Sequence, residues 1–237
     1  MQPAPSYDAV TIPYLLMVLG WMPVMGVLSY LRLKSGKPLP PKSRRYRGMI
    51  ALQIVLLGYS LVIAQQHRVD LLGRVPGIWT WSAAAVYLTW IAFRLHRAWK
   101  KLNAQRKQRA RILLPENPGE LRYWVPISLL AGLSEECAFR GMAYVALQEI
   151  SGSVALAMTV CVLAFAVAHM MQGWRGMLGT GVIALILHGI VYLTQGLWLA
   201  IAVHTLYDLI VGTIAMRHFM RDDLLLASEA QPISAGA

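Results

Sequence analysis

The chain is poor in cysteine and in charge. Its two cysteines, Cys137 and Cys161, both fall in apolar stretches, so no disulfide framework is expected. Charged residues make up only 14% of the 237 residues, whereas hydrophobic residues make up 57%. A soluble domain ordinarily carries more charge than this. The composition therefore favours a protein that crosses a membrane several times.

Acidic residues are scarcer than basic ones, with 11 Asp and Glu against 22 Lys and Arg. Most of the basic residues gather in two blocks that contain no acid, 32–47 with seven and 94–111 with eight. A basic run can bind nucleic acid, but both blocks lie directly beside apolar stretches. We therefore expect no nucleic-acid partner. We expect two cytoplasmic loops that face anionic lipid.

Seven stretches are long enough to cross a membrane, for which a helix needs about 20 mostly apolar residues. The expected fold is therefore all-α and polytopic, with about seven transmembrane helices. The two basic blocks follow the first and third stretches, which places the N-terminus outside and the C-terminus in the cytoplasm. The expected spans are 10–31, 48–66, 76–95, 123–148, 152–171, 177–194 and 197–216.

The spans group into three expected units, with no soluble domain among them. Residues 1–122 hold the first three spans and both basic loops, and residues 123–217 hold the four later spans. Residues 218–237 form a cytoplasmic tail, with disorder expected from about residue 227. The second basic block either continues the third helix out of the membrane or lies along its surface as an amphipathic helix.

Charged and titratable side chains occur inside three of the later spans, where lipid would exclude them. Three acids and an arginine placed there separately would cost on the order of 10 kcal/mol on insertion scales. Such groups are tolerated when they pair in a protein interior, so a polar site inside the helical bundle is expected. The candidate site residues are Glu135, Glu136, Arg140, His169, His204 and Asp208.

The spacing of these residues is helical. Glu136 precedes Arg140 by four positions, which is the favourable order for an ion pair within one helix. Glu135 points about 100° away from Glu136, so one carboxylate can be neutralised while the other faces another direction. His169 and His204 lie in two other spans. Packing of the three helices could bring Glu135 and both histidines to one cavity.

This set of side chains suits hydrolysis. A carboxylate shielded from water can act as a general base, and a nearby histidine can orient the water or donate to a developing oxyanion. Asp208 could accept a hydrogen bond from an imidazole or help to hold the water. Glu135, His169 and His204 are also a possible zinc-ligand set. Both schemes end in water attacking a carbonyl, and the residues alone leave the choice open.

The ordered trio of motifs resembles the CAAX protease and bacteriocin-processing enzyme family (CPBP, or Abi) of intramembrane proteases. That family has Glu-Glu-x-x-x-Arg, Phe-x-x-x-His and His-x-x-x-Asn/Asp on separate membrane helices. Here these are Glu135 to Arg140, Phe165 to His169, and His204 to Asp208. The resemblance covers roughly residues 123–216. It implies that Glu136 and Arg140 support the site.

The resemblance also implies roles for the remaining site residues. Glu135 would be the water-activating base with His169 as its partner, and His204 with Asp208 would stabilise the oxyanion. The prenyl-protein proteases have asparagine at the last of these positions. An acid cannot donate to an oxyanion unless it is protonated, which favours a structural or metal-related role for Asp208.

The expected function is an intramembrane endopeptidase that uses glutamate-activated water. It would cut a peptide bond near the C-terminus of a membrane-anchored protein or peptide. No cofactor is expected, and zinc is the alternative. A second hypothesis is a catalytically silent scaffold or immunity protein, against which the complete motifs argue. A third is a small proton or metal transporter, against which the lack of an internal repeat argues. The expected location is the inner (cytoplasmic) membrane of a bacterium or archaeon.

Overall fold

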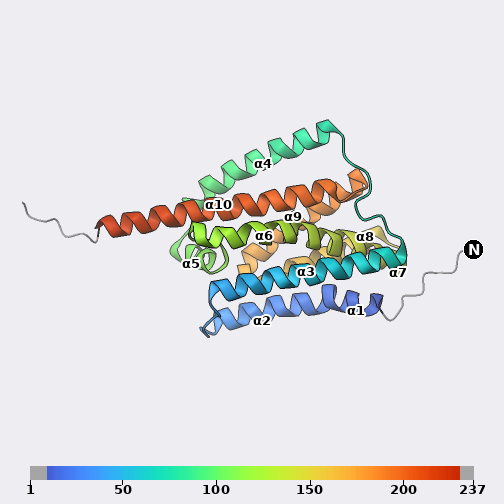
Figure 1. The fold of residues 1–237 in the computed structure, drawn as a ribbon, viewed down its shortest axis with the longest axis horizontal. Helices are drawn as coiled ribbons and strands as arrows, with labels where there is room; N and C mark the ends of the chain where they lie inside the picture. Colours follow the sequence, from blue (N-terminus) through green and yellow to red (C-terminus); the bar gives the residue numbers. More distant parts are fainter. Residues whose placement is uncertain (1–9, 230–237) are drawn as a thin grey trace, which may run out of the picture.

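The computed structural model describes residues 10–229, and helices are the regular elements of that range. They run roughly along one common axis, and α1 begins at the end of the bundle opposite to the one where α10 ends (Figure 1). The predicted all-α fold is therefore confirmed. The elements are α1 (Thr11–Leu16), η1 (Met17–Trp21), α2 (Met22–Lys34), α3 (Lys42–His67), α4 (Ile78–Trp99), α5 (Ala104–Leu113), α6 (Pro118–Glu135), η2 (Glu136–Met142), α7 (Ala143–Ser151), α8 (Val154–Ala168), η3 (Met170–Gln172), α9 (Trp174–Thr194) and α10 (Trp198–Glu229).

Each of the seven expected spans corresponds to a helix or to a run of consecutive helical segments. Among the described residues, four helices are long and apolar enough to cross a membrane. They are Thr11–Lys34, Lys42–His67, Trp174–Thr194 and Trp198–Leu226. The number of seven crossings and the orientation of the termini stay predictions.

Polar residues at the helix starts explain where several helices begin. The first N–H groups of a helix have no partner within it, and an Asn or Ser side chain at the preceding position can accept from one of them. The side chain of Asn117 accepts from the backbone N–H of Glu120 at 3.0 Å and so starts α6. Asn103 and Ser153 do the same for α5 and α8.

The helix ends do not coincide with the boundaries of the expected units, and the division into units stays a prediction. The second basic block is divided, because α4 ends at Trp99 and α5 is a separate helix. The boundary expected between residues 122 and 123 lies inside α6, which begins at Pro118. The tail expected from residue 218 begins inside α10, and residues 227–229, expected to be disordered, are helical. Residues 230–237 lie outside the described residues.

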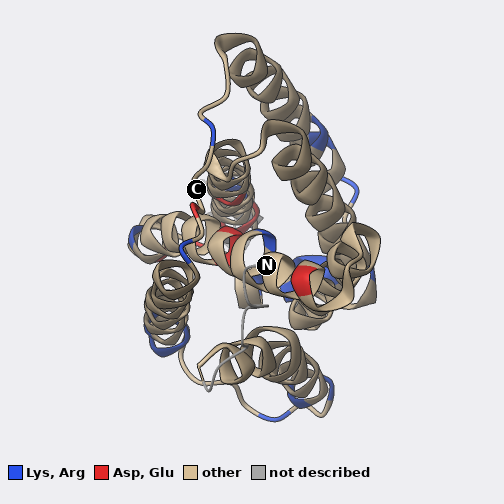
Figure 2. Ribbon diagram, turned by 90° about the vertical axis from the view of Figure 1, so that its right-hand side faces the viewer, with Lys and Arg blue, Asp and Glu red and all other residues tan. Residues whose placement is uncertain are grey.

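The long helix formed by α6, η2 and α7 lies inside the bundle. α6 packs against α3 and α10, and η2 contacts α3, α8 and α9. This helix carries buried polar residues from Ser128 to Arg140. Because neighbouring helices surround them, these groups avoid contact with lipid. Figure 2 views the bundle nearly end-on and shows how little of the ribbon carries Lys, Arg, Asp or Glu.

The outer faces of the helices carry large apolar side chains. Trp79 is 85% exposed, Leu193 81% and Val86 71%. Extensive apolar surface of this kind is unfavourable in water and marks a surface that another apolar phase or partner covers. Together with the four apolar helices, it identifies an integral membrane protein.

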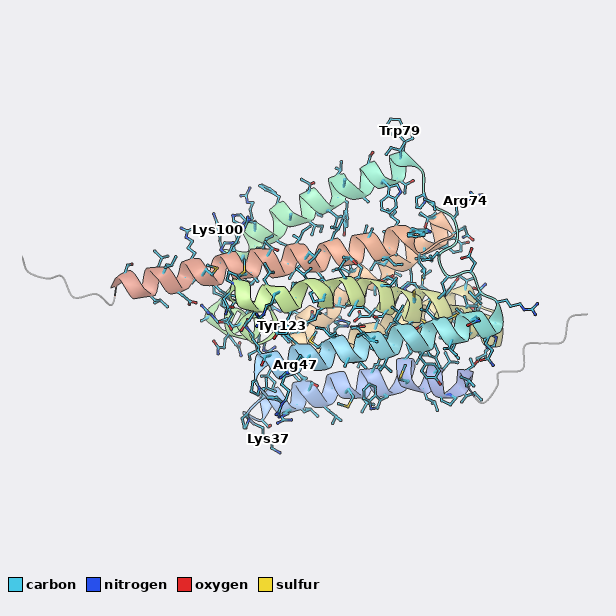
Figure 3. The ribbon with its side chains drawn as sticks, in the orientation of Figure 1. Lys37, Arg47, Arg74, Trp79, Lys100 and Tyr123 are labelled. Atoms are coloured by element: carbon cyan, nitrogen blue, oxygen red, sulfur yellow. The ribbon has the colours of Figure 1, made fainter. Side chains whose placement is uncertain are left out.

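The charged loops alternate between the two ends of the bundle. Figure 3 shows Lys37, Arg47 and Lys100 near the end where α10 leaves the bundle, and Arg74 and Trp79 near the opposite end. Both basic blocks therefore lie at the same end. This arrangement agrees with helices that cross in alternating directions.

Ion pairs connect four segments at the basic end. Lys42, at the start of α3, contacts Glu116 at 2.6 Å and Glu120 at 2.7 Å. Arg111 of α5 contacts Glu116 at 2.7 Å and Asp223 of α10 at 2.6 Å. Partial burial raises the pKa of Glu116, but hydrogen bonds from Lys42 and Arg111 outweigh this and hold the pKa below its ordinary value. The network joins α5 to the ends of α3, α6 and α10.

A glycine permits the close approach of α6 and α10. A Cβ atom at Gly132 would overlap the hydroxyl oxygen of Thr205 and lie 3.0 Å from its backbone nitrogen. Small residues allow such close backbone contact between membrane helices. Thr205 follows His204, so the contact at Gly132 sets how far this histidine lies from the polar residues of α6 and η2.

We expect Gly132→Ala to destabilise the protein, because the added methyl group must push α10 away. Overpacking of this kind costs about 1–3 kcal/mol. The control is Gly58→Ala in α3, where nothing lies within 4 Å of the added atom. An alanine in an open helical position stabilises a helix by up to about 1 kcal/mol. Thermal unfolding in detergent should show a lower Tm for Gly132→Ala alone, and equal Tm values for both variants would contradict this packing.

Candidate active site

Five of the six predicted site residues come together in the middle of the bundle. Four of them are buried, and Asp208 is the most exposed, with 26% of its side chain accessible. The sixth, His169, lies one aromatic ring away, beyond Phe165. The five are Glu135, Glu136, Arg140, His204 and Asp208.

The centre of the site is a chain of three charged or titratable side chains. Arg140 donates through Nη1 to Oε1 of Glu136 at 3.0 Å, which confirms the pair predicted from the spacing. Nδ1 of His204 lies 2.7 Å from the same oxygen. Because a carboxylate oxygen can only accept, Nδ1 of His204 carries the hydrogen of this bond. One buried carboxylate thus holds a guanidinium and an imidazole.

The other nitrogen of His204 faces two further carboxylates. Nε2 lies 3.9 Å from Oε2 of Glu135 and 3.7 Å from Oδ2 of Asp208. Glu135 and Glu136 point in different directions, as predicted, and their carboxylates approach opposite nitrogens of the His204 ring. The bond to Glu136 fixes the orientation of the ring and leaves Nε2 directed at the site.

The backbone at this point is a π-helix. It runs from Glu136 to Met142 and is buried along its whole length. Such stretches are rare within α-helices and occur frequently at functional sites. Glu136 and Arg140 both lie in this stretch, and Glu135 directly precedes it.

The contacts of Phe165 explain why the second motif has an aromatic residue at this position. The guanidinium of Arg140 lies over its ring, 4.3 Å from the centroid. The ring also contacts Phe139 edge-on at 5.0 Å between centroids, and it contacts His169 at 4.5 Å. A cation over an aromatic face is attracted to it, and more strongly where water is absent. Phe165 therefore stabilises the charge of Arg140 and separates it from His169.

His169 ends α8 and is only partly buried. Its Nδ1 donates to the backbone carbonyl of Phe165 at 2.8 Å, which leaves Nε2 for another partner. Within residues 10–229, no hydrogen bond or ion pair joins His169 to Glu135, although His169 interacts electrostatically with Asp208. The predicted partnership of His169 with Glu135 stays a prediction.

Asp208 is held through its backbone. The indole N–H of Trp124 donates to the carbonyl oxygen of Asp208 at 2.9 Å. Gly212, one turn further along α10, leaves the space in which the Trp124 ring packs. The carboxylate itself is the part of the site that is most open to its surroundings.

Two residues of the site were not among the candidates. Gln53 of α3 donates through Nε2 to Oε1 of Glu135 at 2.6 Å, and the hydroxyl of Ser134 donates to Oε1 of Gln53. A sequence signal existed, because Gln53 is an amide within an apolar span, and such residues often serve a function. The three motifs that carry the family resemblance lie outside that span.

Three other buried residues lie outside these contacts. His188 donates from Nδ1 to the carbonyl of Ala184 in its own helix at 3.0 Å. Cys137 and Cys161 are free thiols, as the absence of a disulfide framework predicted.

A zinc ion would require several ligands directed at one point. In the part of the chain that the structure describes, no group of three or more His, Cys, Asp or Glu side chains is arranged to hold a metal ion. Nδ1 of His204 donates to Glu136 and Nδ1 of His169 to the carbonyl of Phe165, which leaves Nε2 of each ring as the nitrogen that could bind a metal. Zinc bound by Glu135, His169 and His204 stays an untested alternative to a site without metal.

The geometry defines a class of protein, a helical membrane protein with a buried carboxylate–histidine centre. Comparison with known proteins agrees with this class. Residues 117–210 match the family model described as Rce1-like, Type II CAAX prenyl endopeptidase Rce1-like. This match confirms the resemblance to the CAAX protease family, and it spans every predicted site residue. Comparisons with curated proteins and with solved structures found no match.

We expect Glu136→Gln to be strongly destabilising, because it removes the anion between Arg140 and His204. Breaking one partner of a buried ion pair typically costs about 3–5 kcal/mol. The matched control is Glu135→Gln, which alters a neighbouring carboxylate that makes no contact with Arg140. Thermal unfolding and cellular abundance should fall for Glu136→Gln and stay near wild type for Glu135→Gln. Equal losses in both variants would show that the Glu136 contacts contribute no special stability.

Proposed function

We propose that this protein is an intramembrane endopeptidase that hydrolyses a peptide bond with water activated by Glu135. The observation that carries the proposal is the state of the Glu135 carboxylate. One oxygen is held by Gln53, whereas the other, Oε2, is buried, accepts no hydrogen bond from residues 10–229 and lies 3.9 Å from Nε2 of His204. A buried oxygen without a donor lowers the stability of the protein. Binding of the water that reacts would explain why this oxygen is kept.

The first step would be removal of a proton from water by Oε2 of Glu135. The 3.9 Å separation between Oε2 and Nε2 of His204 allows one water molecule to bond to both atoms at once. The resulting hydroxide attacks the carbonyl carbon of the peptide bond. Shielding from bulk water strengthens the interaction of the carboxylate with that proton.

The second step would be collapse of the tetrahedral intermediate. In its protonated form, His204 can donate through Nε2 to the oxyanion, while Glu136 and Arg140 keep the ring in place. Glu135 then returns its proton to the leaving amine as the C–N bond breaks. One water is consumed, and an amine and a carboxylic acid are formed.

Asp208 would act by orienting His204 and not by donating to the oxyanion. Its carboxylate lies 3.7 Å from Nε2 of His204, where it can attract a protonated ring. This role needs no proton on Asp208 and agrees with an acid at a position where the prenyl-protein proteases have asparagine.

We propose that the reaction needs no metal. In residues 10–229, no group of three or more His, Cys, Asp or Glu side chains is arranged to hold a metal ion, which supports this proposal. The charge of Glu136 is also already balanced by Arg140. Activity that survives a chelator would agree with this proposal.

The substrate would be a membrane-anchored protein or peptide cut near its C-terminus. The matched family model is named for prenyl endopeptidases, so a prenylated C-terminal peptide is the first substrate to test. The buried site and the apolar outer faces of the helices suit a substrate held in the membrane by a lipid or an apolar segment.

The test of the proposed function is Glu135→Gln, which preserves shape but removes the base. Loss of a general base typically lowers the rate by about 10²–10⁴-fold. Purified protein in detergent or lipid vesicles should lose cleavage of a prenylated peptide while its thermal unfolding stays close to wild type. Wild-type activity should persist after exhaustive chelation.

Two outcomes would contradict the proposal. Cleavage or a cellular phenotype that is unchanged in Glu135→Gln would favour a scaffold. Stoichiometric zinc that is lost on chelation together with activity would favour a metal-bound water.

We further propose that the chain crosses the membrane seven times, with its N-terminus outside and its C-terminus in the cytoplasm. The position of Lys37, Arg47 and Lys100 at one end of the bundle supports this orientation (Figure 3). The same basic end would face the anionic lipid of the cytoplasmic leaflet. The inner membrane of a bacterium or archaeon remains the proposed location.

The orientation is testable with reporter fusions. We expect fusions after Lys42 and after Lys107 to report the cytoplasm, and a fusion after Arg68 to report the outside. The Arg68 fusion is the internal control, since the loop 68–77 lies at the opposite end of the bundle. An external signal from either basic block would overturn the orientation.

A further inference from the structure

Gln53 is a buried amide in the middle of α3, with 6% of its surface exposed. Its neighbours along the chain are Leu52 and Ile54, so it interrupts an otherwise apolar segment. An amide that lacks partners in such a place is costly, and an apolar residue would fill the space without that cost. The partners of Gln53 are two adjacent residues of the site, Ser134 and Glu135.

The contacts of Gln53 fix which end of the amide faces Glu135. The hydroxyl of Ser134 donates to Oε1 of Gln53, so the NH₂ group is the end that lies 2.6 Å from Oε1 of Glu135. Ser134 precedes Glu135 in the chain, and the three residues form a closed ring of contacts. A flipped amide would place its oxygen against Oε1 of Glu135 and lose that bond, because a carboxylate oxygen can only accept.

These contacts make the two oxygens of the Glu135 carboxylate unequal. Oε1 accepts the amide hydrogen, whereas Oε2 faces His204 and has no donor among the described residues. Rotation of the carboxylate would break the bond to Gln53. The amide therefore holds the plane of the carboxylate and fixes the direction of the oxygen that is available for water.

We propose that Gln53 is a positioning residue for Glu135 and that the N-terminal spans thereby complete the active site. This inference rests on the proposed function. Gln53 lies outside residues 117–210, which match the family model, so the match alone does not assign it a role. The segment 117–210 would then supply the reacting groups, and α3 would supply their alignment.

The test is Gln53→Met, which keeps the approximate length of the side chain but removes the donor. Misplacement of a reacting group by about 1 Å can lower the rate by about 10²-fold. We expect kcat to fall by that order while KM stays within about twofold, because the substrate-binding contacts remain. Ser134→Ala should lower kcat less, and adding it to Gln53→Met should cause little further loss, since both act on one contact.

The matched control is Ser60→Ala, in the same helix. Ser60 is also buried and polar, but it contacts Tyr14 and the carbonyl of Leu56, not Glu135. We expect it to affect stability and to leave kcat near wild type. A loss of kcat in Ser60→Ala equal to that in Gln53→Met would show a general effect of α3. Independent, multiplying effects of Gln53→Met and Ser134→Ala would also overturn the inference.

An infrared measurement tests the inference without any substrate. The difference spectrum between wild type and Glu135→Gln identifies the carboxylate band of Glu135. Loss of a hydrogen bond to one oxygen should shift this band in Gln53→Met and not in Ser60→Ala. An unmoved band would overturn the role of Gln53. If the band shifts in Gln53→Met but the wild-type protein cleaves no peptide, the contact between Gln53 and Glu135 is supported and the proposed function is rejected.

Discussion

The buried carboxylate of Glu136 is the interaction on which the rest of the site depends. Its Oε1 accepts from Arg140 and from His204, so one oxygen joins η2 to α10. A buried ion pair is seldom a large net source of stability, but removal of one partner leaves a costly unpaired charge. The arrangement therefore restricts which packings of these helices are possible, and it fixes His204 in a single orientation.

The surrounding structure keeps this centre closed and aligned. Gly132 lets α6 approach α10, the buried π-helix η2 carries Glu136 and Arg140, and Phe165 covers the guanidinium of Arg140. The outer faces of the same helices are apolar and suit lipid. A polar site can thus exist inside a membrane protein, because α3, α8, α9 and α10 pack around α6 and η2 and keep the charged groups from lipid.

Much of the fold followed from the sequence, because apolar stretches of about 20 residues have few other structures available in a membrane. The pairing of Glu136 with Arg140 also followed, since it depends on local helical spacing. The contact between Glu136 and His204 did not, because it depends on how two distant helices pack. The participation of Gln53 was missed for the same reason, as 82 positions separate it from Glu135. The first residue of α6, Pro118, and the last residue of α10, Glu229, lie outside the expected spans. Hydropathy marks the apolar part of a helix and not its full length.

The most direct test of the central claim is a double-mutant cycle between Glu136→Gln and His204→Asn, measured as unfolding free energies in detergent. Residues in one hydrogen-bonded network typically show coupling of about 0.5–3 kcal/mol, whereas independent residues add within about 0.5 kcal/mol. The account predicts coupling of about 1.5 kcal/mol or more, at the level of charge-assisted bonds. Additive effects of the two substitutions would contradict it, because Glu136 would then not hold His204.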